Sequence, residues 1–456
     1  MNTVRIGAGA GYAGDRIEPA LDLVEHGTLD YLVFECLAER TIALAQRARM
    51  RDPDAGYDAL LVPRMQRLLP LLARHPVKVI SNMGAANPLA AVARIRELAS
   101  TSGLAVPRIA AITGDDVFDR IAEYAEATVL ETGEPLRKLK GTLISANAYL
   151  GARPIAAALA AGAEMIITGR VADPSLFVAP LMHEFGHAWS DFTFLGRATV
   201  TGHLLECAGQ LTGGYFADPG CKAVPDPWNI GFPIATVAAD GAAQFGKLAG
   251  TGGLLTAATV KEQLLYEIHD PSRYLTPDVV ADFSSVEIID HGGDRVEVSG
   301  GDGSPKSGRL KVSIGYLDGF AGHGEISYAG TGAVDRARLA AEIITHRLRT
   351  IGLLPRAMRC DVIGVNSLFA DSKSWSDNYA ATQCRDVRLR IAAHVDTREQ
   401  AELIGREVEA LYTNGPAGGG GVTAGVSERV SIASILIPES DVNPQVIGEG
   451  EHHATT

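Results

Sequence analysis

The chain has 456 residues, 46% of them hydrophobic and 21% charged, so it is long enough for two or three domains with substantial cores. Its 41 basic and 54 acidic residues give a net charge of −13, which argues against a nucleic-acid-binding surface and against binding to an anionic membrane. The five cysteines are scattered without a C-x-x-C pair, which favours a reduced, cytoplasmic compartment. We expect no secretory signal, because the N-terminus MNTVRIGAGAG lacks a charged segment followed by an apolar one. We also expect no transmembrane helix, because no apolar run reaches about 18 residues.

Residues 1–184 repeat a β-strand followed by a helix. The expected strands are short apolar runs at 4–7, 31–34, 77–81, 109–113, 142–146 and 165–168. The helical patterns lie at 17–26, 38–49, 60–74, 89–100, 117–126 and 154–161, and a further helix follows Pro174. Six such units predict an α/β fold with an open, mostly parallel sheet and helices on both faces. A closed barrel is the alternative, but eight units are not visible.

Two further regions follow this parallel α/β domain. Residues 185–282 break the rhythm, and we expect them to cap the ligand-binding edge of the sheet and complete a cleft. From 283 to 448 the hydrophobic period changes to two, with Gly-Gly and Asp-Gly turns and two later helices. This pattern predicts an antiparallel, ferredoxin-like α+β domain, and 449–456 is expected to be a frayed tail.

Polar side chains follow the ends of the predicted strands. They are Asp15, Arg16, Glu35, Asn82, Asn87, Asp115, Asp116, Asn147, Tyr149, Arg153, Arg170 and Asp173. Because the carboxyl ends of parallel strands meet at one edge of a sheet, we expect these side chains to converge there. Arginines that face carboxylates suit a carboxylate or phosphate ligand. Taken singly, Asp115 and Asp173 have an alternative interpretation as helix N-caps.

His203 and Glu206 are three residues apart in a predicted helix, so they lie on one helical face. They form a candidate acid–base pair beside the Gly-Gly-Tyr turn at 213–215. A structural hydrogen bond between them is the alternative interpretation.

A glycine-rich turn follows the first predicted strand. Gly9, Gly11 and Gly14 match the dinucleotide fingerprint G-x-G-x-x-G, and Glu35 stands at the end of the second strand, where a ribose-binding acid is expected. Asp15 opposes this interpretation, because it puts an acid where a pyrophosphate would bind. The alternative is a tight turn between strand and helix.

The segment His183–His187, HEFGH, matches the zinc-binding pattern H-E-x-x-H. On a helix, His183 and His187 would share a face and hold zinc, with Glu184 as the base of a zinc hydrolase. Gly186 weakens that helix, and the alternative is a helix terminus with exposed histidines, so we expect no metal site.

Several long motifs resemble the acyclic terpene utilisation AtuA family. They include GYAGDRIEPA, LDYLVFECLAERT, SNMGAANP, SANAYLGARPIAAALAAGAEMIITGRVADPSL, GHLLECAGQLTGGYFADPG and GHGEISYAG, and with the others they cover most of residues 5–440. The family pattern usually has an aromatic residue at the position of His187, which argues further against zinc.

The resemblance implies a role in the bacterial breakdown of citronellol- and geraniol-type acids as CoA thioesters. It indicates no firm cofactor, with a CoA thioester as the possible substrate. Longer relatives carry an additional C-terminal domain, so the resemblance also implies a separately encoded small subunit as a partner, and we expect a homo-oligomer.

We expect a hydratase- or lyase-type enzyme acting on a branched or unsaturated acyl-CoA or carboxylate. Asp15, Asp173, His203 and Glu206 would transfer protons. The expected substrate-binding residues are Arg16, Asn82, Asn87, Asn147, Tyr149, Arg153 and Arg170. The alternatives are a non-catalytic binding or scaffold subunit and the zinc hydrolase.

Overall fold

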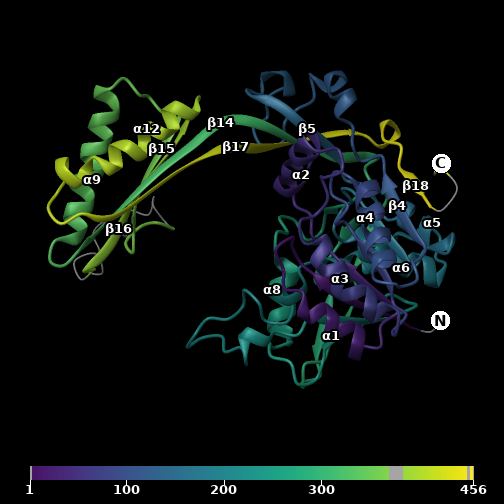
Figure 1. Ribbon diagram of the computed structural model, residues 1–456. Coiled ribbons are helices and arrows are strands. Elements are labelled where there is room, and N and C mark those ends of the chain that lie inside the picture. The colour runs from purple at the N-terminus through teal and green to yellow at the C-terminus, as the bar shows by residue number, and fades with distance from the viewer. Residues whose placement is uncertain (1–2, 369–383, 449–451, 455–456) are drawn as a thin grey trace. The chain divides into compact units, whose positions relative to one another are not determined.

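The computed structural model of the chain describes residues 3–368, 384–448 and 452–454. The chain divides into two compact units (Figure 1). The larger unit comprises Met1–Leu139, Ile144–Gly315 and Ile432–Thr456, and the smaller comprises Lys140–Leu143 and Tyr316–Ser431. In the part of the chain that is described, no helix combines the length and the apolar character needed to cross a membrane.

An eleven-stranded sheet forms the centre of the larger unit. Its strands, in spatial order, are β11 (Glu287–Asp290), β12 (Val296–Ser299), β8 (Ala243–Lys247), β7 (Pro233–Ala238), β1 (Thr3–Ala10), β2 (Tyr31–Phe34), β3 (Lys78–Ser81), β6 (Met165–Thr168), β4 (Ile109–Thr113), β18 (Gln445–Ile447) and β19 (His452–Ala454). The neighbours from β1 to β4 pair in parallel, and all other neighbours are antiparallel.

The predicted α/β class is confirmed, but the sheet is mixed and mostly antiparallel rather than mostly parallel. The difference arises because β7, β8, β11 and β12, which lie beyond the predicted α/β domain, join this sheet beside β1. The C-terminal strand β18 adds to its other edge, antiparallel to β4. The predicted tail 449–456 lies outside the described residues, except for β19, which pairs with β18.

One predicted strand of the parallel series belongs elsewhere. β5 (Thr142–Ala148) pairs with β14 (Arg309–Ala329) instead of joining the eleven-stranded sheet. The amide of Gly315 donates to the hydroxyl of Ser145 at 3.1 Å, which ties the two strands together through a buried side chain. The strand expected at 142–146 is therefore not a member of the parallel sheet.

Two groups of helices pack on the sheet of the larger unit. The helices are α1 (Glu18–His26), α2 (Glu39–Arg51), α3 (Leu61–Leu72), α4 (Pro88–Thr101), α5 (Arg153–Ala160), α6 (Ser175–Phe185), α7 (Phe192–Glu206) and α8 (Ala257–Leu265). α1, α3 and α4 pack together, and α5, α6 and α7 form a second group. Connections between parallel strands of one sheet are right-handed crossovers. From β1 to β4 the chain moves towards one edge of the sheet, and from β4 it returns to β6, which lies between β3 and β4. The two groups of helices therefore cover opposite faces of the sheet.

Shorter elements complete the larger unit. The helix expected at 117–126 is a 3₁₀ segment, η1 (Phe118–Tyr124), and the other 3₁₀ turns are η2 (Leu136–Lys138), η3 (Ala208–Gln210), η4 (Pro227–Asn229) and η5 (Glu439–Asp441). A three-stranded sheet contains β13 (Asp302–Ser304), β10 (Val280–Asp282) and β9 (Tyr274–Leu275).

The smaller unit has its own sheet and core. The strands occur in the order β15 (Ala357–Ile363), β16 (Asp386–Val395), β14 and β17 (Gly420–Pro438). The helices α9 (Ala333–Thr350) and α12 (Arg398–Glu409) pack on β16, and a short helix α13 (Leu411–Asn414) follows (Figure 1). Apolar side chains of α9, α12, β14 and β16 form one buried cluster, which defines the core of this unit.

Candidate functional site

Buried polar residues follow four of the parallel strands in the larger unit. Glu35 follows β2, Asn82 follows β3, Asp115 comes two residues after β4, and Arg170 comes two residues after β6. The Glu35 carboxylate accepts a hydrogen bond from the Asn82 amide at 3.0 Å. Asp115 accepts from the backbone amide of Arg170 at 3.0 Å and from the side chain of Asn147 at 2.9 Å. These bonds link neighbouring strand ends at one edge of the sheet.

Arg170 lies at the centre of this edge with only 1% of its surface exposed. Its guanidinium donates to the carbonyl oxygens of Leu37 and Val171 and forms an ion pair with Asp173. The guanidinium carbon also lies 4.5 Å from the centre of the Tyr149 ring. Because its donors point at protein acceptors and solvent cannot reach it, Arg170 holds Asp173 in place and is closed to a substrate.

Asp173 is the accessible member of this ion pair, with 36% of its side chain exposed. Partial desolvation raises the pKa of the Asp173 carboxyl, and the Arg170 charge opposes that shift. Burial raises the pKa of Glu35 well above its ordinary value, and the Asp173 charge adds to this effect. Two carboxyls near one arginine are therefore biased towards their protonated forms.

Glu39 lies beyond Tyr149 and has the opposite bias. The Tyr149 hydroxyl donates to Glu39 at 2.6 Å, and the ammonium of Lys311 lies 2.9 Å from the same carboxylate oxygen. Burial alone would raise the pKa of Glu39, but these two partners outweigh it and lower the pKa to about 2. Glu39 is thus held as an anion beside carboxyls that bind protons more readily.

His203 and Glu206 form a hydrogen-bonded pair at the end of α7. The Nδ1 atom of His203 lies 2.9 Å from Oε1 of Glu206, and its Nε2 atom lies 2.9 Å from the carbonyl oxygen of Gln263. Since a carbonyl only accepts, Nε2 carries hydrogen, and one further proton lies between Nδ1 and Oε1. Burial raises the pKa of Glu206 to about 7, and the charge of Asp173 contributes to this shift.

These residues form one electrostatically connected set within the larger unit. We define the Asp173 cluster as Glu35, Glu39, Tyr149, Arg170, Asp173, His203, Glu206 and Lys311. The Oε2 atom of Glu206 is buried and has no hydrogen-bond partner among the described residues. The cluster therefore combines two partly exposed carboxylates, Glu39 and Asp173, with a buried proton-sharing pair, His203 and Glu206.

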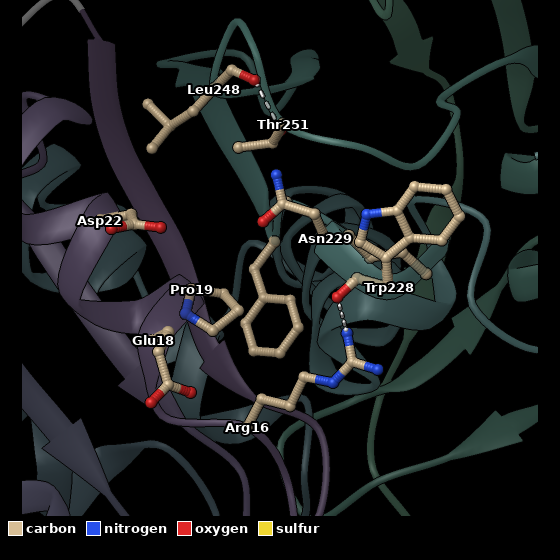
Figure 2. Close-up of a pocket in the computed structure, with 11 residues that line it drawn as sticks. Arg16, Glu18, Pro19, Asp22, Trp228, Asn229, Leu248 and Thr251 are labelled. Atoms are coloured by element: carbon tan, nitrogen blue, oxygen red, sulfur yellow. Dashed lines mark hydrogen bonds between the residues drawn. The ribbon is translucent and has the colours of Figure 1, made fainter. Parts of the chain in front are cut away.

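Other predicted site residues lie apart from the cluster. Asp15 accepts from the backbone amide of Gly11 at 2.9 Å and closes its own turn. Arg16 is exposed and donates to the carbonyl of Trp228 at 2.9 Å (Figure 2). Asn87 caps the N-terminus of α4 and binds two backbone carbonyls, which is a structural role. Arg153 is exposed and stacks on Trp189 with 5.0 Å to the ring centre.

The alternative interpretation as helix N-caps is wrong for both Asp115 and Asp173. α6 begins at Ser175 with Pro174 as its N-cap, and no side chain caps it, so Asp173 is not an N-cap. Asp115 has the partners given above and caps no helix. Its neighbour Asp116 accepts from the amide of Phe118 at 3.1 Å and from Gln46 at 2.8 Å, so it supports the turn into η1.

The HEFGH segment does not have the geometry of a zinc site. α6 ends at Phe185, and Gly186 adopts the left-handed conformation with φ of 68°, so His183 and His187 are not on one helical face. His187 bonds Asp191 at 2.9 Å and stacks on Phe194. Across the described ranges, no group of three metal-binding side chains is found.

The glycine fingerprint is explained by close packing. A Cβ atom at Gly9 would lie 2.7 Å from the Phe34 ring, and one at Gly11 would lie 2.4 Å from the backbone of Cys207. The glycines therefore let β1 and its turn approach neighbouring elements. Since Asp15 occupies the Gly11 amide, this amide is not open to a pyrophosphate.

Sequence reasoning missed Glu39, Lys311 and Gln263. The only signal for Glu39 was an acid in the first turn of the helix that follows β2. Lys311 comes from β14, in a region that was assigned to a different domain. Gln263 contributes its backbone carbonyl to His203, and a residue type carries no information about such a contact.

Comparison with known proteins adds one finding to this geometry. The family model described as acyclic terpene utilisation family protein AtuA matches residues 4–447. Comparisons with curated proteins and with solved structures give no match. Because the model spans nearly the whole chain and includes every residue of the Asp173 cluster, the chain belongs to the acyclic terpene utilisation family AtuA.

Proposed function

We propose that this AtuA-family protein acts in the cytoplasmic breakdown of acyclic terpenes by acid–base chemistry at the Asp173 cluster. The substrate class is a branched or unsaturated acyl-CoA thioester or the corresponding carboxylate. The reaction is of hydratase or lyase type, which adds water across a carbon–carbon double bond or removes it. Such a step moves a proton and a hydroxyl group and needs no oxidant.

The observation that carries this proposal is the partly exposed Asp173 carboxylate, which lies in one cluster with the buried acids Glu35 and Glu206. Its side chain is 36% exposed, whereas Arg170 behind it is 1% exposed. General acid–base catalysis works best when the pKa of the catalytic group lies near the working pH, and the pKa of Glu206 is about 7. The cluster therefore offers a reachable carboxyl and a buried group that exchanges a proton near neutrality.

The roles of the predicted residues follow from their contacts. Asp173 contacts the substrate and transfers a proton, and the His203–Glu206 pair holds the proton that replaces it. Arg170 positions Asp173 instead of binding the substrate, because its donors are occupied. Lys311, with 39% of its side chain exposed, is the cation that a thioester carbonyl or carboxylate can reach.

The smaller unit also has a proposed architecture. Support for a ferredoxin-like arrangement comes from its element order, β14-α9-β15-β16-α12-β17, and from the sheet order β15-β16-β14-β17. None of the residues of the Asp173 cluster lies in this unit. The acid–base proposal therefore does not depend on it.

The experiment measures incorporation of deuterium from D₂O into branched, α,β-unsaturated acyl-CoA thioesters and their free acids by mass spectrometry. We expect exchange or hydration with the natural protein and a loss of about 100-fold or more in Asp173→Asn, which is the usual contribution of a general acid or base. Asp54→Asn makes the same chemical change at an exposed residue outside the cluster and is the matched control.

Two results would contradict the proposal. The first is equal turnover in the Asp173 variant and the natural protein. The second is tight thioester binding without exchange or turnover, both alone and with a small partner subunit. This second result would favour the alternative function, a non-catalytic binding or scaffold subunit.

A further inference from the structure

A separate hollow lies in the larger unit, outside the Asp173 cluster. Its volume is about 180 Å³. It is lined by Arg16, Glu18, Pro19, Asp22, Trp228, Asn229, Ile230, Gly231, Phe232, Leu248 and Thr251. These residues come from the start of α1, from the segment around η4 and from the loop that follows β8. No step of the proposed reaction uses this hollow.

An exposed tryptophan borders the hollow. Trp228 is 74% exposed, which leaves most of a large aromatic surface in water. Its indole nitrogen has no hydrogen-bond partner within the described ranges. Pro19 and the buried Phe232 provide apolar surface in the same hollow. A planar ring that stacks on the indole would cover the exposed aromatic face.

Charged groups stand on two sides of this aromatic face. The Arg16 guanidinium is fixed beside Trp228, because its Nη1 atom donates a hydrogen bond of 2.9 Å to the Trp228 carbonyl. Among the described residues, Nε and Nη2 of Arg16 have no such partner, so they can donate to a ligand. Figure 2 shows Asp22 across the hollow from Trp228, with the Asn229 side chain between these two residues. Glu18 is neutralised by an ion pair with Arg67. Among the residues that the structure describes, the hollow thus offers the Arg16 cation, the Asp22 carboxylate and the Asn229 amide to a ligand.

The size of the hollow limits the ligand. Pockets that enclose a whole drug-sized ligand measure about 300–1,000 Å³, so a hollow of about 180 Å³ fits one ring system of a larger molecule. An aromatic wall suits a planar base, and the guanidinium suits a phosphate attached to it. Asp22 and Asn229 can bind ring amino groups or ribose hydroxyls. Together these groups suit a phosphorylated nucleoside whose base carries an amino group, and an adenine nucleotide is such a ligand.

A short loop connects this hollow to the Asp173 cluster. Gly11 packs against the backbone of Cys207, which directly follows Glu206, and Arg16 lies five residues further along the loop. Five residues span at most about 18 Å, so the two sites are near neighbours. A CoA thioester joins an adenine nucleotide to its reacting acyl group through a long, flexible arm. We propose that this hollow binds the adenine nucleotide of the CoA thioester, an inference that rests on the proposed function.

The experiment measures ligand binding without any chemical step. The chain contains three tryptophans, and stacking on Trp228 quenches its share of the fluorescence. The probes are CoA, adenosine 3′,5′-bisphosphate, adenosine, AMP and inorganic phosphate, with affinities checked by calorimetry. The variants are Trp228→Ala and Arg16→Gln, both at exposed side chains, and Trp189→Ala, which removes a tryptophan outside the hollow, is the matched control.

We expect CoA and adenosine 3′,5′-bisphosphate to bind and to quench fluorescence. Loss of one stacking contact should weaken their binding about 5- to 150-fold in Trp228→Ala. Arg16→Gln should remove the preference for the bisphosphate over adenosine, and Trp189→Ala should bind the ligands as the natural protein does. The proposal would be overturned if the natural protein did not bind these ligands. It would also be overturned if the Trp228 and Arg16 variants bound them as tightly as the natural protein does. Tighter binding of AMP than of CoA would assign the hollow to a free nucleotide and would also overturn it.

Failure of this inference is distinguishable from failure of the proposed function. Deuterium exchange into the free acid or into an acyl-pantetheine ester does not involve the nucleotide, so it tests the Asp173 cluster alone. Binding of adenosine 3′,5′-bisphosphate involves no acyl group, so it tests the hollow alone.

Discussion

Asp115 is a buried carboxyl whose replacement gives a quantitative test of the electrostatics at the sheet edge. It is 4% exposed, and burial raises its pKa from an ordinary 3.8 to about 6 in spite of its bonds to Arg170 and Asn147. The folded state therefore holds this proton to a higher pH than the unfolded chain does. Between the two values, the free energy of unfolding falls as the pH rises.

The size of this effect follows from the two pKa values. At about 1.4 kcal/mol per pKa unit, the change from 3.8 to about 6 amounts to about 3 kcal/mol. About 2 kcal/mol of this falls between pH 4 and pH 7.5. Asp115→Asn removes the titration, so the free energy of unfolding of the variant should rise relative to the natural protein by this amount over that range. Any hydrogen bond lost in the variant adds an offset that does not vary with pH.

Urea unfolding at a series of pH values between 4 and 7.5, followed by tryptophan fluorescence, measures this difference. Asp116→Asn makes the same chemical change at the next residue, where the side chain is 40% exposed. A pH-independent difference for Asp115→Asn would refute the reasoning. The same pH dependence in both variants would refute it too, because burial would then not be the cause.

Three further predictions concern neighbouring contacts. Gly11→Ala places a Cβ atom 2.4 Å from backbone and should reduce the free energy of unfolding by about 1–3 kcal/mol, whereas Gly246→Ala, with its nearest atom at 3.7 Å, is the control. Arg64→Met removes donors at 3.1 and 3.3 Å to two carbonyls of the loop after β1, so amide hydrogen exchange should accelerate in that loop and stay unchanged in α9. Lys311→Met should raise the pKa of Glu39 from about 2, as measured by an NMR titration of its carboxyl carbon, and an unchanged value would contradict the assigned cause.

The position of the candidate site was predictable because strand ends are visible in a sequence. Short apolar runs ended directly before Glu35 and Asn82 and within two residues of Asp115 and Arg170, and all four ended at one edge of the sheet. The pairing of His203 with Glu206 followed from their spacing on one helical face. In both cases, local periodicity was sufficient to place the side chain.

The failures occurred where a distant contact decides the outcome. β5 reads as a parallel strand, yet its partner is β14, more than 160 residues later in the chain. The period of two after residue 283 identified antiparallel strands, but it carried no information that β11 and β12 join the sheet of the first domain. The HEFGH segment was not such a failure, because Gly186 already indicated a weak helix: this glycine is left-handed, ends the helix and separates His187 from His183.

The state of Arg170 changes the chemistry that the site supports. A sequence shows an arginine among carboxylates and suggests an anion-binding site, because free guanidinium donors bind carboxylate or phosphate. The structure shows donors that are occupied by two carbonyls and Asp173, so the arginine charge compensates an internal acid. Acids outnumber cations in the Asp173 cluster, and Lys311 is a cation that a single substrate oxygen can reach. The cluster is therefore suited to holding exchangeable protons and poorly suited to binding a multiply charged phosphate. We therefore propose that Asp173 transfers a proton instead of taking part in anion recognition, and that Arg16 in the separate hollow contacts the phosphates.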